Sequence, residues 1–341
     1  MKEALFGKTL SELQQVTTAL GMPRFAAGQI AQWLYKRGVR SIDEMTNLSL
    51  RNRALLAEHY DLGLREPLTC STSVDGTKKY LYPVLDGRHV ESAYIPDGDR
   101  ATLCVSSQAG CKMHCAFCMT GRQGFGGNLT TGEILNQMAS LPERDTLTNI
   151  VYMGMGEPLD NLDNVMRSLE IMTADWGYGW SPTRITLSTA GVIPGLRRFL
   201  AESNVHLAVS LHNPFPEERK EIMPIENAYP IKEVVELLRQ HDFSHQRRVS
   251  FEYIVLKGRN DSPAHIKELC RLLGGLSCRI NLIRFHAIPD SPFVSPDLDT
   301  VTRFRDTLTR KGLMTTIRAS RGEDIQAACG LLSTQKSAES L

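Results

Sequence analysis

From residue 101 onward, short apolar segments alternate with amphipathic segments along almost the whole remaining chain. Six segments have apolar residues at three- and four-residue spacing, which is typical of helices with one buried face; they are 132–141, 162–172, 193–203, 231–240, 264–276 and 300–312. Strand-like segments flank them, at 101–107, 148–155, 184–191, 205–212, 248–256, 279–286 and 314–319. Repeated βα units predict a parallel α/β sheet whose right-handed crossovers curl it into a full or partial barrel. In such barrels the chemistry collects on the loops that follow the strands.

Residues 1–65 show only the helical spacing, and they contain nine Lys or Arg and six Asp or Glu, a net charge of +3. We predict a small, mildly basic helical domain there. Residues 66–100 contain a hairpin pattern around the turn dipeptide Asp86-Gly87, so we expect an extension that links the helical domain to a barrel over 101–330. Residues 331–341 are expected to form a tail.

The composition of the whole chain is that of an ordinary globular protein. Hydrophobic residues make up 42% and charged residues 23% of the 341 residues, and the formal charge is +1. These values exclude a disordered tail protein and predict no strong overall attraction to nucleic acid. No apolar run approaches the roughly 18 residues that span a bilayer, and the first residues lack the apolar core of a signal peptide. We therefore expect a cytoplasmic monomer with no membrane contact.

Three of the eight cysteines, Cys111, Cys115 and Cys118, fall within one short window, CKMHCAFC, after the first predicted barrel strand. In a reducing compartment such clustering points to metal or redox chemistry. Three thiolates can hold three irons of a [4Fe–4S] cluster and leave the fourth iron open to a small molecule. The alternatives are a structural zinc site with His114 as fourth ligand, or three unrelated buried thiols. We expect Cys70, Cys270 and Cys278 to be packing residues.

The cysteine motif and its flanks resemble a known family. Cys-x3-Cys-x2-Cys after the first strand of a βα barrel resembles the motif of the radical S-adenosylmethionine (SAM) enzymes. Further segments resemble the ribosomal RNA adenine methyltransferases of the RlmN/Cfr type, namely FAAGQIAQWLYKRGVRSIDEMTNLS, YMGMGEPLDN, ITLSTAG, VSLHNP and RGEDIQAACG. The resemblance covers about residues 25–330. It implies a radical SAM partial (β/α)6 TIM-like barrel, a [4Fe–4S] cluster and SAM as cofactors, and an RNA-binding helical domain.

The resemblance also assigns residues that bind SAM. Gly156 and Glu157, after the second barrel strand, would align the amino group of its methionine moiety, with Glu157 accepting charge-assisted hydrogen bonds. Ser188, and the run Ser210, Leu211 and His212, would contact the ribose and carboxylate. As bare sequence, a strand-ending Ser is more often a helix cap than a ligand. His286 stands where the family usually has Asn.

Two further cysteines, Cys104 and Cys329, gain a role only through the resemblance, because buried free thiols usually pack as small apolar groups. Direct electrophilic methylation would fail at the electron-poor C2 carbon of adenine. The family instead methylates Cys329 with one SAM, and a 5′-deoxyadenosyl radical from a second SAM takes hydrogen from that methyl group. The resulting carbon radical adds to the base. A Cys104–Cys329 disulfide then releases the product, with Glu91 as the proton acceptor.

The substrate that the resemblance implies is C2 of adenine in 23S rRNA, with tRNA as a second substrate and flavodoxin or ferredoxin as electron donor. Phe125 resembles the C2 branch of the family. One alternative is the C8-methylating branch linked to antibiotic resistance. The other is a non-catalytic iron–sulfur RNA-binding protein, which would need neither Cys104 nor Cys329. The family usually has Arg where this chain has Gly127, so a basic contact is either missing or supplied from elsewhere.

Overall fold

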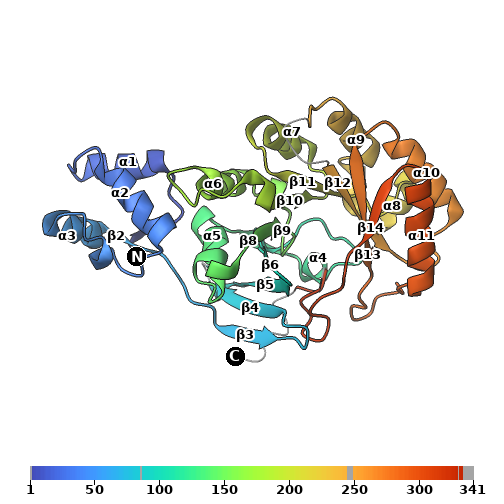
Figure 1. The fold of residues 1–341 in the computed structure, drawn as a ribbon, viewed down its shortest axis with the longest axis horizontal. Coiled ribbons are helices and arrows are strands. Elements are labelled where there is room, and N and C mark those ends of the chain that lie inside the picture. Colours follow the sequence, from blue (N-terminus) through green and yellow to red (C-terminus); the bar gives the residue numbers. More distant parts are fainter. Residues whose placement is uncertain (1, 85–86, 244–248, 329, 333–341) are drawn as a thin grey trace.

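The computed structural model describes residues 2–84, 87–243, 249–328 and 330–332 (Figure 1). Ten strands form one sheet in the order β14-β13-β12-β11-β10-β9-β6-β5-β4-β3. In chain order the strands are β3 Thr69–Thr72, β4 Lys78–Pro83, β5 His89–Asp97, β6 Arg100–Cys104, β9 Asn149–Tyr152, β10 Ile185–Thr189, β11 His206–Ser210, β12 Val249–Val255, β13 Cys278–Arg284 and β14 Met314–Ile317.

Within this sheet β6 and the six strands from β9 to β14 all pair in parallel, as the alternation of segments predicts. Helices on the outer side connect them: α5 Thr131–Ala139, α6 Leu162–Thr173, α7 Ile193–Glu202, α8 Pro216–Ile222, α9 Ile231–Arg239, α10 Pro263–Leu273 and α11 Leu298–Arg310. Within the described residues β3 and β14 each pair with a single neighbour, so the sheet stays open. The predicted partial barrel with six βα units is confirmed.

The local sequence explains these helices. α5 begins with a capping box, in which Thr130 accepts a hydrogen bond from the Glu133 N–H and the Glu133 carboxylate accepts one from the Thr130 N–H. α9 buries Ile231, Val234 and Leu238 on one face, at the three- and four-residue spacing that predicted it. α9 therefore covers the sheet with one apolar face, whereas α5 is buried over most of its length.

The strands before the barrel extend its sheet on one side. β3, β4 and β5 pair antiparallel with one another, and β5 pairs antiparallel with β6. The predicted hairpin is therefore present as β4–β5, although Asp86 of its turn lies outside the described residues. The prediction that Cys70 is a packing residue is wrong, since its side chain is exposed on the edge strand β3, whereas Cys278 is buried.

The N-terminal residues form a helical lobe at one end of the molecule (Figure 1). Its elements are β1 Glu3–Ala4, α1 Leu10–Ala19, α2 Ala26–Ala31 with a π-helical continuation Gln32–Arg37, α3 Leu50–His59 and β2 Tyr60–Asp61. One continuous cluster of buried side chains runs from this lobe into the barrel, and it includes Leu13 of α1, Leu135 of α5 and Phe251 of β12. The lobe and the barrel thus share a core, and the domain limits at residues 65, 100 and 330 remain predictions.

Two close contacts join the lobe to the barrel helix α5. The Arg65 N–H donates to Asn136 Oδ1 at 2.9 Å, and Asn136 Nδ2 donates to the Arg65 carbonyl at 2.8 Å. Gly7 has φ +94°, and a Cβ atom there would lie 2.4 Å from the backbone nitrogen of Gly132 at the start of α5. Only glycine permits this approach of the two backbones.

We expect Gly7→Ala to destabilise the protein by about 2–4 kcal/mol, because it adds both a positive-φ penalty and a backbone clash. Gly28→Ala is the matched control, since Gly28 lies in α2 and a Cβ there would meet no atom within 4 Å beyond its own helix backbone. That change should be neutral or stabilise the fold by up to about 1 kcal/mol. The stabilities of the two variants are compared by the midpoints of their urea unfolding curves, provided that the dependence of the unfolding free energy on urea concentration is the same in both. Equal midpoints would contradict a tight backbone contact between lobe and barrel.

Candidate active site

The three clustered cysteines lie on a loop at the carboxyl-terminal mouth of the barrel. This cysteine loop (residues 111–118) connects β7 Gln108–Gly110 to the short helix α4 Met119–Gln123. The Cys111 N–H donates to the Gly124 carbonyl at 2.9 Å, and the Ala116 N–H donates to the Ile222 carbonyl at the end of α8, also at 2.9 Å. These contacts turn all three cysteines toward one cavity, which we call the first cavity.

The thiols of the cysteine loop are in an environment that disfavours free thiolates. Burial raises the pKa of Cys111 to about 12 and that of Cys115 well above its usual value. Thiolates there would therefore need a bound cationic centre to stabilise them. His114, the fourth ligand of the zinc alternative, is exposed and is not part of the described cavity lining. In the part of the chain that the structure describes, no three Cys, His, Asp or Glu side chains converge on a single metal ion.

Glu157 lies on the opposite side of the first cavity. The preceding Gly156 has φ +100°, and a Cβ there would lie 2.5 Å from the Gln108 side chain, so the turn requires glycine. The buried Glu157 carboxylate accepts hydrogen bonds from Thr189 Oγ1 at 2.6 Å and from the Ala190 N–H at 2.7 Å. Burial raises the pKa of Glu157 to about 7, although these hydrogen bonds lower it. The site therefore holds a carboxylate that a cationic ligand would stabilise.

The strand-end residues of β10 and β11 complete the first cavity. Ser188, Ser210 and His212 line it, whereas the Leu211 side chain is fully buried in the main core. His212 Nδ1 accepts a hydrogen bond from the Ile254 N–H at 3.0 Å. Since Nδ1 is an acceptor, the proton of the neutral ring is on Nε2. Burial lowers the pKa of His212 to about 3, with a further contribution from Arg219.

Arg219 of α8 was not singled out from the sequence, because PEERKEI is an ordinary charged helical segment. Its side chain is nevertheless fully buried. The guanidinium donates to the carbonyls that end β10 and β11, those of Ala190 at 3.1 Å, Ser210 at 2.9 Å and Leu211 at 2.9 Å, and it pairs with Glu226. A buried cation with this many partners fixes the backbone that carries the cavity residues.

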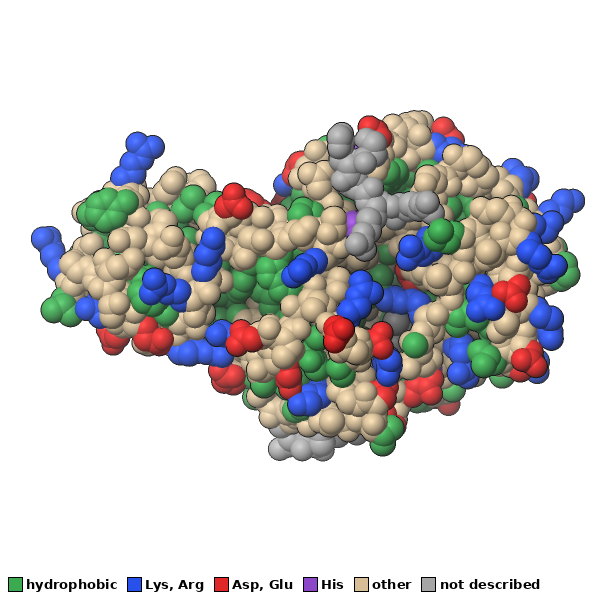
Figure 2. Space-filling view, in the orientation of Figure 1, with side chains coloured by type: hydrophobic (Ala, Val, Ile, Leu, Met, Phe, Trp, Pro, Cys, Tyr) green, Lys and Arg blue, Asp and Glu red, His purple; other side chains and the backbone are tan. Residues whose placement is uncertain are grey.

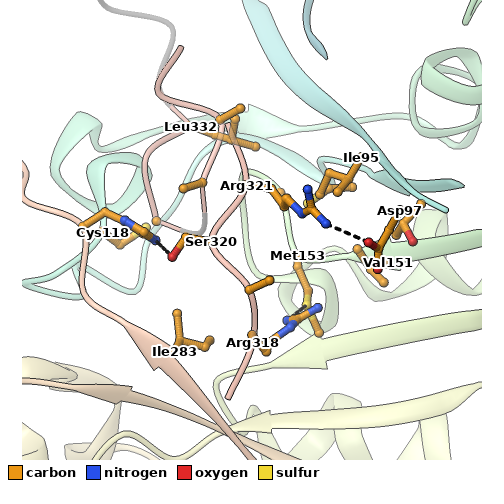
Figure 3. Close-up of a pocket in the computed structure, with 18 of the residues that line it drawn as sticks. Ile95, Asp97, Cys118, Val151, Met153, Ile283, Arg318, Ser320, Arg321 and Leu332 are labelled. Carbon is orange, nitrogen blue, oxygen red and sulfur yellow. Dashed lines mark hydrogen bonds and ion pairs between the residues drawn. The ribbon is translucent and has the colours of Figure 1, made fainter. Parts of the chain in front are cut away.

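A second cavity adjoins the first (Figure 3). Cys118, Met153, Gly154, Ile283, Arg318 and Gly330 line both. Cys104, at the end of β6, lines only the second cavity and packs against Ala93 and Ala327. Cys329 itself lies outside the described residues, but Ala328 and Gly330 on either side of it line the second cavity. The structure therefore brings Cys104 and the neighbours of Cys329 to one mouth, beside the cysteine loop.

Arg318 lies at the boundary of the two cavities. Its Nη1 is 3.3 Å from the Glu252 carboxylate and 3.2 Å from the Met153 sulfur. Glu252 is buried and also accepts a hydrogen bond from Asn281 at 2.7 Å. Arg100 and Arg321 line the second cavity as well, with Arg321 paired to Asp97 at 2.7 Å. The second cavity thus has three guanidinium groups in its wall, which suits an anionic ligand.

Two predicted site residues lie away from the first cavity. His286 lines the second cavity, and its Nδ1 is 2.7 Å from the Glu323 carboxylate. Burial lowers the pKa of His286, although Glu323 opposes this effect. Glu91 is buried on β5 and pairs with Lys79 at 3.0 Å. Glu91 is not part of the described lining of either cavity. Its side chain is on the same face of β5 as that of Ala93, which comes two residues later.

The structure also shows what stands near the unusual Gly127. This residue, in β8 Phe125–Asn128, has φ +151°, and a Cβ there would lie 1.8 Å from Arg88 Nη1. Arg88 donates to the neighbouring Gly126 carbonyl. The guanidinium of Arg88 therefore occupies the space that a side chain at position 127 would need. A basic group is present at this point, and it is supplied from β4–β5.

Family models match both parts of the chain. The model described as the radical SAM superfamily matches residues 105–273, and the model described as the ribosomal RNA large subunit methyltransferase N-terminal domain matches residues 4–62. The barrel, the cysteine loop and the adjoining cavities are thus those of a radical SAM enzyme. In the described residues no helix is both long and apolar enough to cross a membrane.

Relatives match over nearly the full length. The "Probable dual-specificity RNA methyltransferase RlmN" of Bacteroides fragilis is 64% identical, covering 99% of this chain and 98% of its own. The "Dual-specificity RNA methyltransferase RlmN" of Marinobacter nauticus is 43% identical, covering 97% and 92%. The crystal structure of a radical SAM methyltransferase from Sphaerobacter thermophilus has a TM-score of 0.91 at 41% identity, covering 97% of this chain and 99% of that one. The chain belongs to the RlmN family of radical SAM RNA methyltransferases.

Enzymes of this superfamily use a [4Fe–4S] cluster and SAM, and the first cavity fits both. Its cysteine loop offers three sulfur ligands, the donor type that iron–sulfur clusters take. The Glu157 carboxylate suits the amino group of SAM, while Ser188, Ser210 and His212 offer hydroxyl and Nε2–H donors to its oxygen atoms.

We expect His212 to remain neutral, as the Nε2–H tautomer, from pH 8 down to pH 5. Nitrogen-15 NMR of labelled histidine would show this directly, with His212→Gln used to assign the signal. Because the unfolded ring takes a proton near pH 6.5 and the folded one only near pH 3, its burial makes the fold less stable as pH falls between these values. A ring that titrates near pH 6.5 in the folded protein would contradict the hydrogen bond from Ile254.

Proposed function

We propose that this chain transfers a methyl group to C2 of adenine in 23S rRNA and in tRNA through a methylated cysteine. The observation that carries the proposal is that Cys104 and the chain on both sides of Cys329 meet in the second cavity, against the cysteine loop. A protein that merely bound RNA through a cluster would need no such pair of thiols. The relatives named as dual-specificity RNA methyltransferases support both RNA classes.

In this proposal the first cavity binds the cofactors. Cys111, Cys115 and Cys118 ligate three irons, and Glu157 binds the amino group of SAM next to Gly156. Ser188 and the run Ser210–His212 hold its ribose and carboxylate, with Leu211 contributing only through its backbone. When bound, the cluster and SAM supply the methyl group and the reductive cleavage that yields a hydrogen-abstracting radical. Cys118 and Arg318 line both cavities, so this chemistry takes place next to the substrate.

The handling of the methyl carbon is assigned to Cys329, to Cys104 of the second cavity and to Glu91, which lines neither cavity. Cys329 accepts the methyl group on its sulfur and loses its thiol proton, and the same carbon, after loss of one hydrogen, bonds to the adenine ring. Cys104 then attacks the Cys329 sulfur: the S–S bond forms as the bond from that sulfur to the added carbon breaks, and this carbon takes a proton to become the methyl group. The unpaired electron of the adduct would pass to the cluster, when bound, and an external thiol reductant would return the disulfide to two thiols. Glu91 accepts the proton from the ring carbon, and Lys79 stabilises its carboxylate. His286 acts in the second cavity rather than on SAM, since its partners there are Glu323 and Ser320.

RNA reaches the second cavity across a basic surface. Figure 2 shows lysine and arginine side chains around the hollow near the middle of this face. Arg100, Arg318 and Arg321 in the cavity wall suit the phosphates of the target nucleotide. The helical lobe, with its net charge of +3, adds backbone contacts that offset the cost of taking the adenine out of its stack. We further propose that the enzyme is a cytoplasmic monomer that receives electrons from a flavodoxin or ferredoxin.

Mass spectrometry tests the position of methylation. The reconstituted protein is incubated anaerobically with SAM, dithionite and either 23S rRNA or tRNA, and the RNA is digested to nucleosides. We expect 2-methyladenosine from both RNAs, because Phe125 resembles the C2 branch of the family and the Cys104–Cys329 route can reach an electron-poor ring carbon. A methyl group on C8 would contradict the C2 assignment. Absence of both methyladenosine and 5′-deoxyadenosine would contradict radical methylation altogether.

Substitution of Cys104 and of Cys329 separates their proposed roles. Cys104→Ala leaves the methyl carrier intact but removes the thiol that releases the product, so the protein should accumulate covalently bound to RNA. A slow-migrating, nuclease-sensitive band on a denaturing gel would report this adduct. Cys329→Ala, alone or combined with Cys104→Ala, should give no band. Cys270→Ala, at a half-buried position on α10, is the control that should behave as the unsubstituted protein. If Cys104→Ala gives no adduct during turnover, release by disulfide formation is wrong.

A further inference from the structure

The described chain just before Cys329, residues 318–328, contains little regular structure. We call it the C-terminal segment. After β14 it crosses the mouth of the barrel, and its residues line the second cavity. A segment without strand or helix pairing must be held by other contacts if the residues it carries are to have a fixed position. Besides the pairs Arg318–Glu252, Arg321–Asp97 and Glu323–His286 described above, contacts from the β3–β4 turn, about 250 residues away in sequence, hold the segment.

Two aspartates link the C-terminal segment to the β3–β4 turn in opposite directions. Asp75 of the turn accepts hydrogen bonds from the Gly322 N–H, on Oδ2 at 2.9 Å, and from the Thr77 N–H, on Oδ1 at 2.9 Å. Asp324 of the segment accepts hydrogen bonds from Ser73 Oγ at 2.5 Å and from the Val74 N–H at 3.2 Å. We call this pair the aspartate clamp. The Gly322 N–H of the segment donates to Asp75 of the turn, and Ser73 and Val74 of the turn donate to Asp324 of the segment, so each of the two loops supplies a carboxylate that binds the other.

The electrostatics agree with this geometry. Although desolvation opposes ionisation, hydrogen bonds from Gly322 and Thr77 lower the pKa of Asp75 to about 2. The Ser73 hydroxyl is the main cause that lowers the pKa of Asp324. Both carboxylates are therefore ionised at neutral pH, and charge-assisted hydrogen bonds of this kind are stronger than neutral ones.

The aspartate clamp determines where the end of the segment lies. Gly322, with φ +62°, begins a turn in which the Ala327 N–H donates to the Gly322 carbonyl at 2.8 Å. A Cβ on Gly322 would lie 2.8 Å from Ala327 Cβ and 2.9 Å from Thr77 Cγ2. The turn that begins at Gly322 is therefore packed closely both on itself and on the β3–β4 turn. Ala327 in turn packs against Cys104 and Ala93. The clamp is thus connected through one tight turn to the thiol of the second cavity.

We propose that Asp75 and Asp324 are positioning residues for methyl transfer, because they hold the segment that leads directly into Cys329. This inference rests on the proposed function, in which the Cys329 sulfur has to meet first a methyl donor and then an adenine ring. An error of about 1 Å in the position of a reacting group can cost about a hundredfold in rate. Neither aspartate lines the second cavity, so neither touches the reacting atoms.

Hydrogen–deuterium exchange of the protein without cofactors tests the contact itself. In Asp75→Ala the Gly322 amide should exchange at least tenfold faster, and in Asp324→Ala the Val74 amide should do so. The amides of β12, in the middle of the sheet, should be unaffected. Asp297→Ala is the matched control, because Asp297 also accepts a backbone hydrogen bond, from Thr300 at 2.7 Å, but does so within its own helix as the cap of α11. It should leave the Gly322 and Val74 amides unchanged. Unchanged exchange in the clamp variants would overturn the inference.

Turnover then tests the positioning role. The readout is the ratio of methylated RNA to 5′-deoxyadenosine, which a simple loss of folded or cluster-loaded protein leaves unchanged. We expect this ratio to fall at least tenfold in Asp75→Ala and in Asp324→Ala. It should fall less in Asp75→Asn, because the amide keeps one acceptor oxygen, and it should stay constant in the control Asp297→Ala. Gly322→Ala should lower the ratio by shifting the same turn.

The outcomes distinguish the two proposals. If the unsubstituted protein makes 5′-deoxyadenosine but never methylates Cys329, the proposed function fails, and the positioning role fails with it. Faster hydrogen–deuterium exchange in the variants would then still establish the clamp as a structural contact. If the unsubstituted protein methylates RNA and the clamp variants exchange faster but keep its ratio, only the positioning inference is overturned.

Discussion

The buried guanidinium of Arg219 organises the carboxyl-terminal mouth of the barrel. It donates to the carbonyls of Ala190, Ser210 and Leu211, where two neighbouring strands end, and its charge is balanced by Glu226. A charge can be buried only when its donors are satisfied, so the strand ends cannot move independently of α8. Two further contacts connect these strand ends and α8 to the residues of the first cavity. The N–H of Ala190 holds Glu157, and the carbonyl of Ile222, at the end of α8, holds the cysteine loop.

The two cavities divide the chemistry between them. The first contains the thiols of the cysteine loop and a buried carboxylate, both of which favour a cationic or metal-bearing occupant. The second contains guanidinium groups and Cys104, which suit an anionic polynucleotide and a thiol reaction. Arg318 belongs to both walls and is held there by the buried Glu252. Because six residues line both cavities, the two cavities adjoin, and a group formed in one lies next to the other.

The helical lobe and the barrel are less separate than two independent domains would be. Tyr35 of the lobe packs against Trp176 and Tyr178 of the barrel, with ring centroids 6.1 and 5.6 Å apart. Together with the shared core, this contact holds the basic lobe at a fixed place against the barrel. A fixed lobe suits recognition of a folded RNA, because the phosphate contacts then set the register of the target nucleotide in the cavity.

Glu157 and Ser188 received their roles only through the family resemblance. By itself, the sequence determined the barrel and the cysteine loop. It could do so because these features depend on residue type at short spacing: apolar periodicity gives the elements, and parallel strands bring their following loops to one mouth. Only the tertiary structure decided which side chains meet across long separations. It pairs Glu91 with Lys79, moves His286 to the second cavity beside Glu323, fills the space at Gly127 with Arg88, and joins Asp75 to Gly322. Such contacts depend on the exact positions of backbone atoms brought together by folding, and a single sequence carries no local pattern that encodes them.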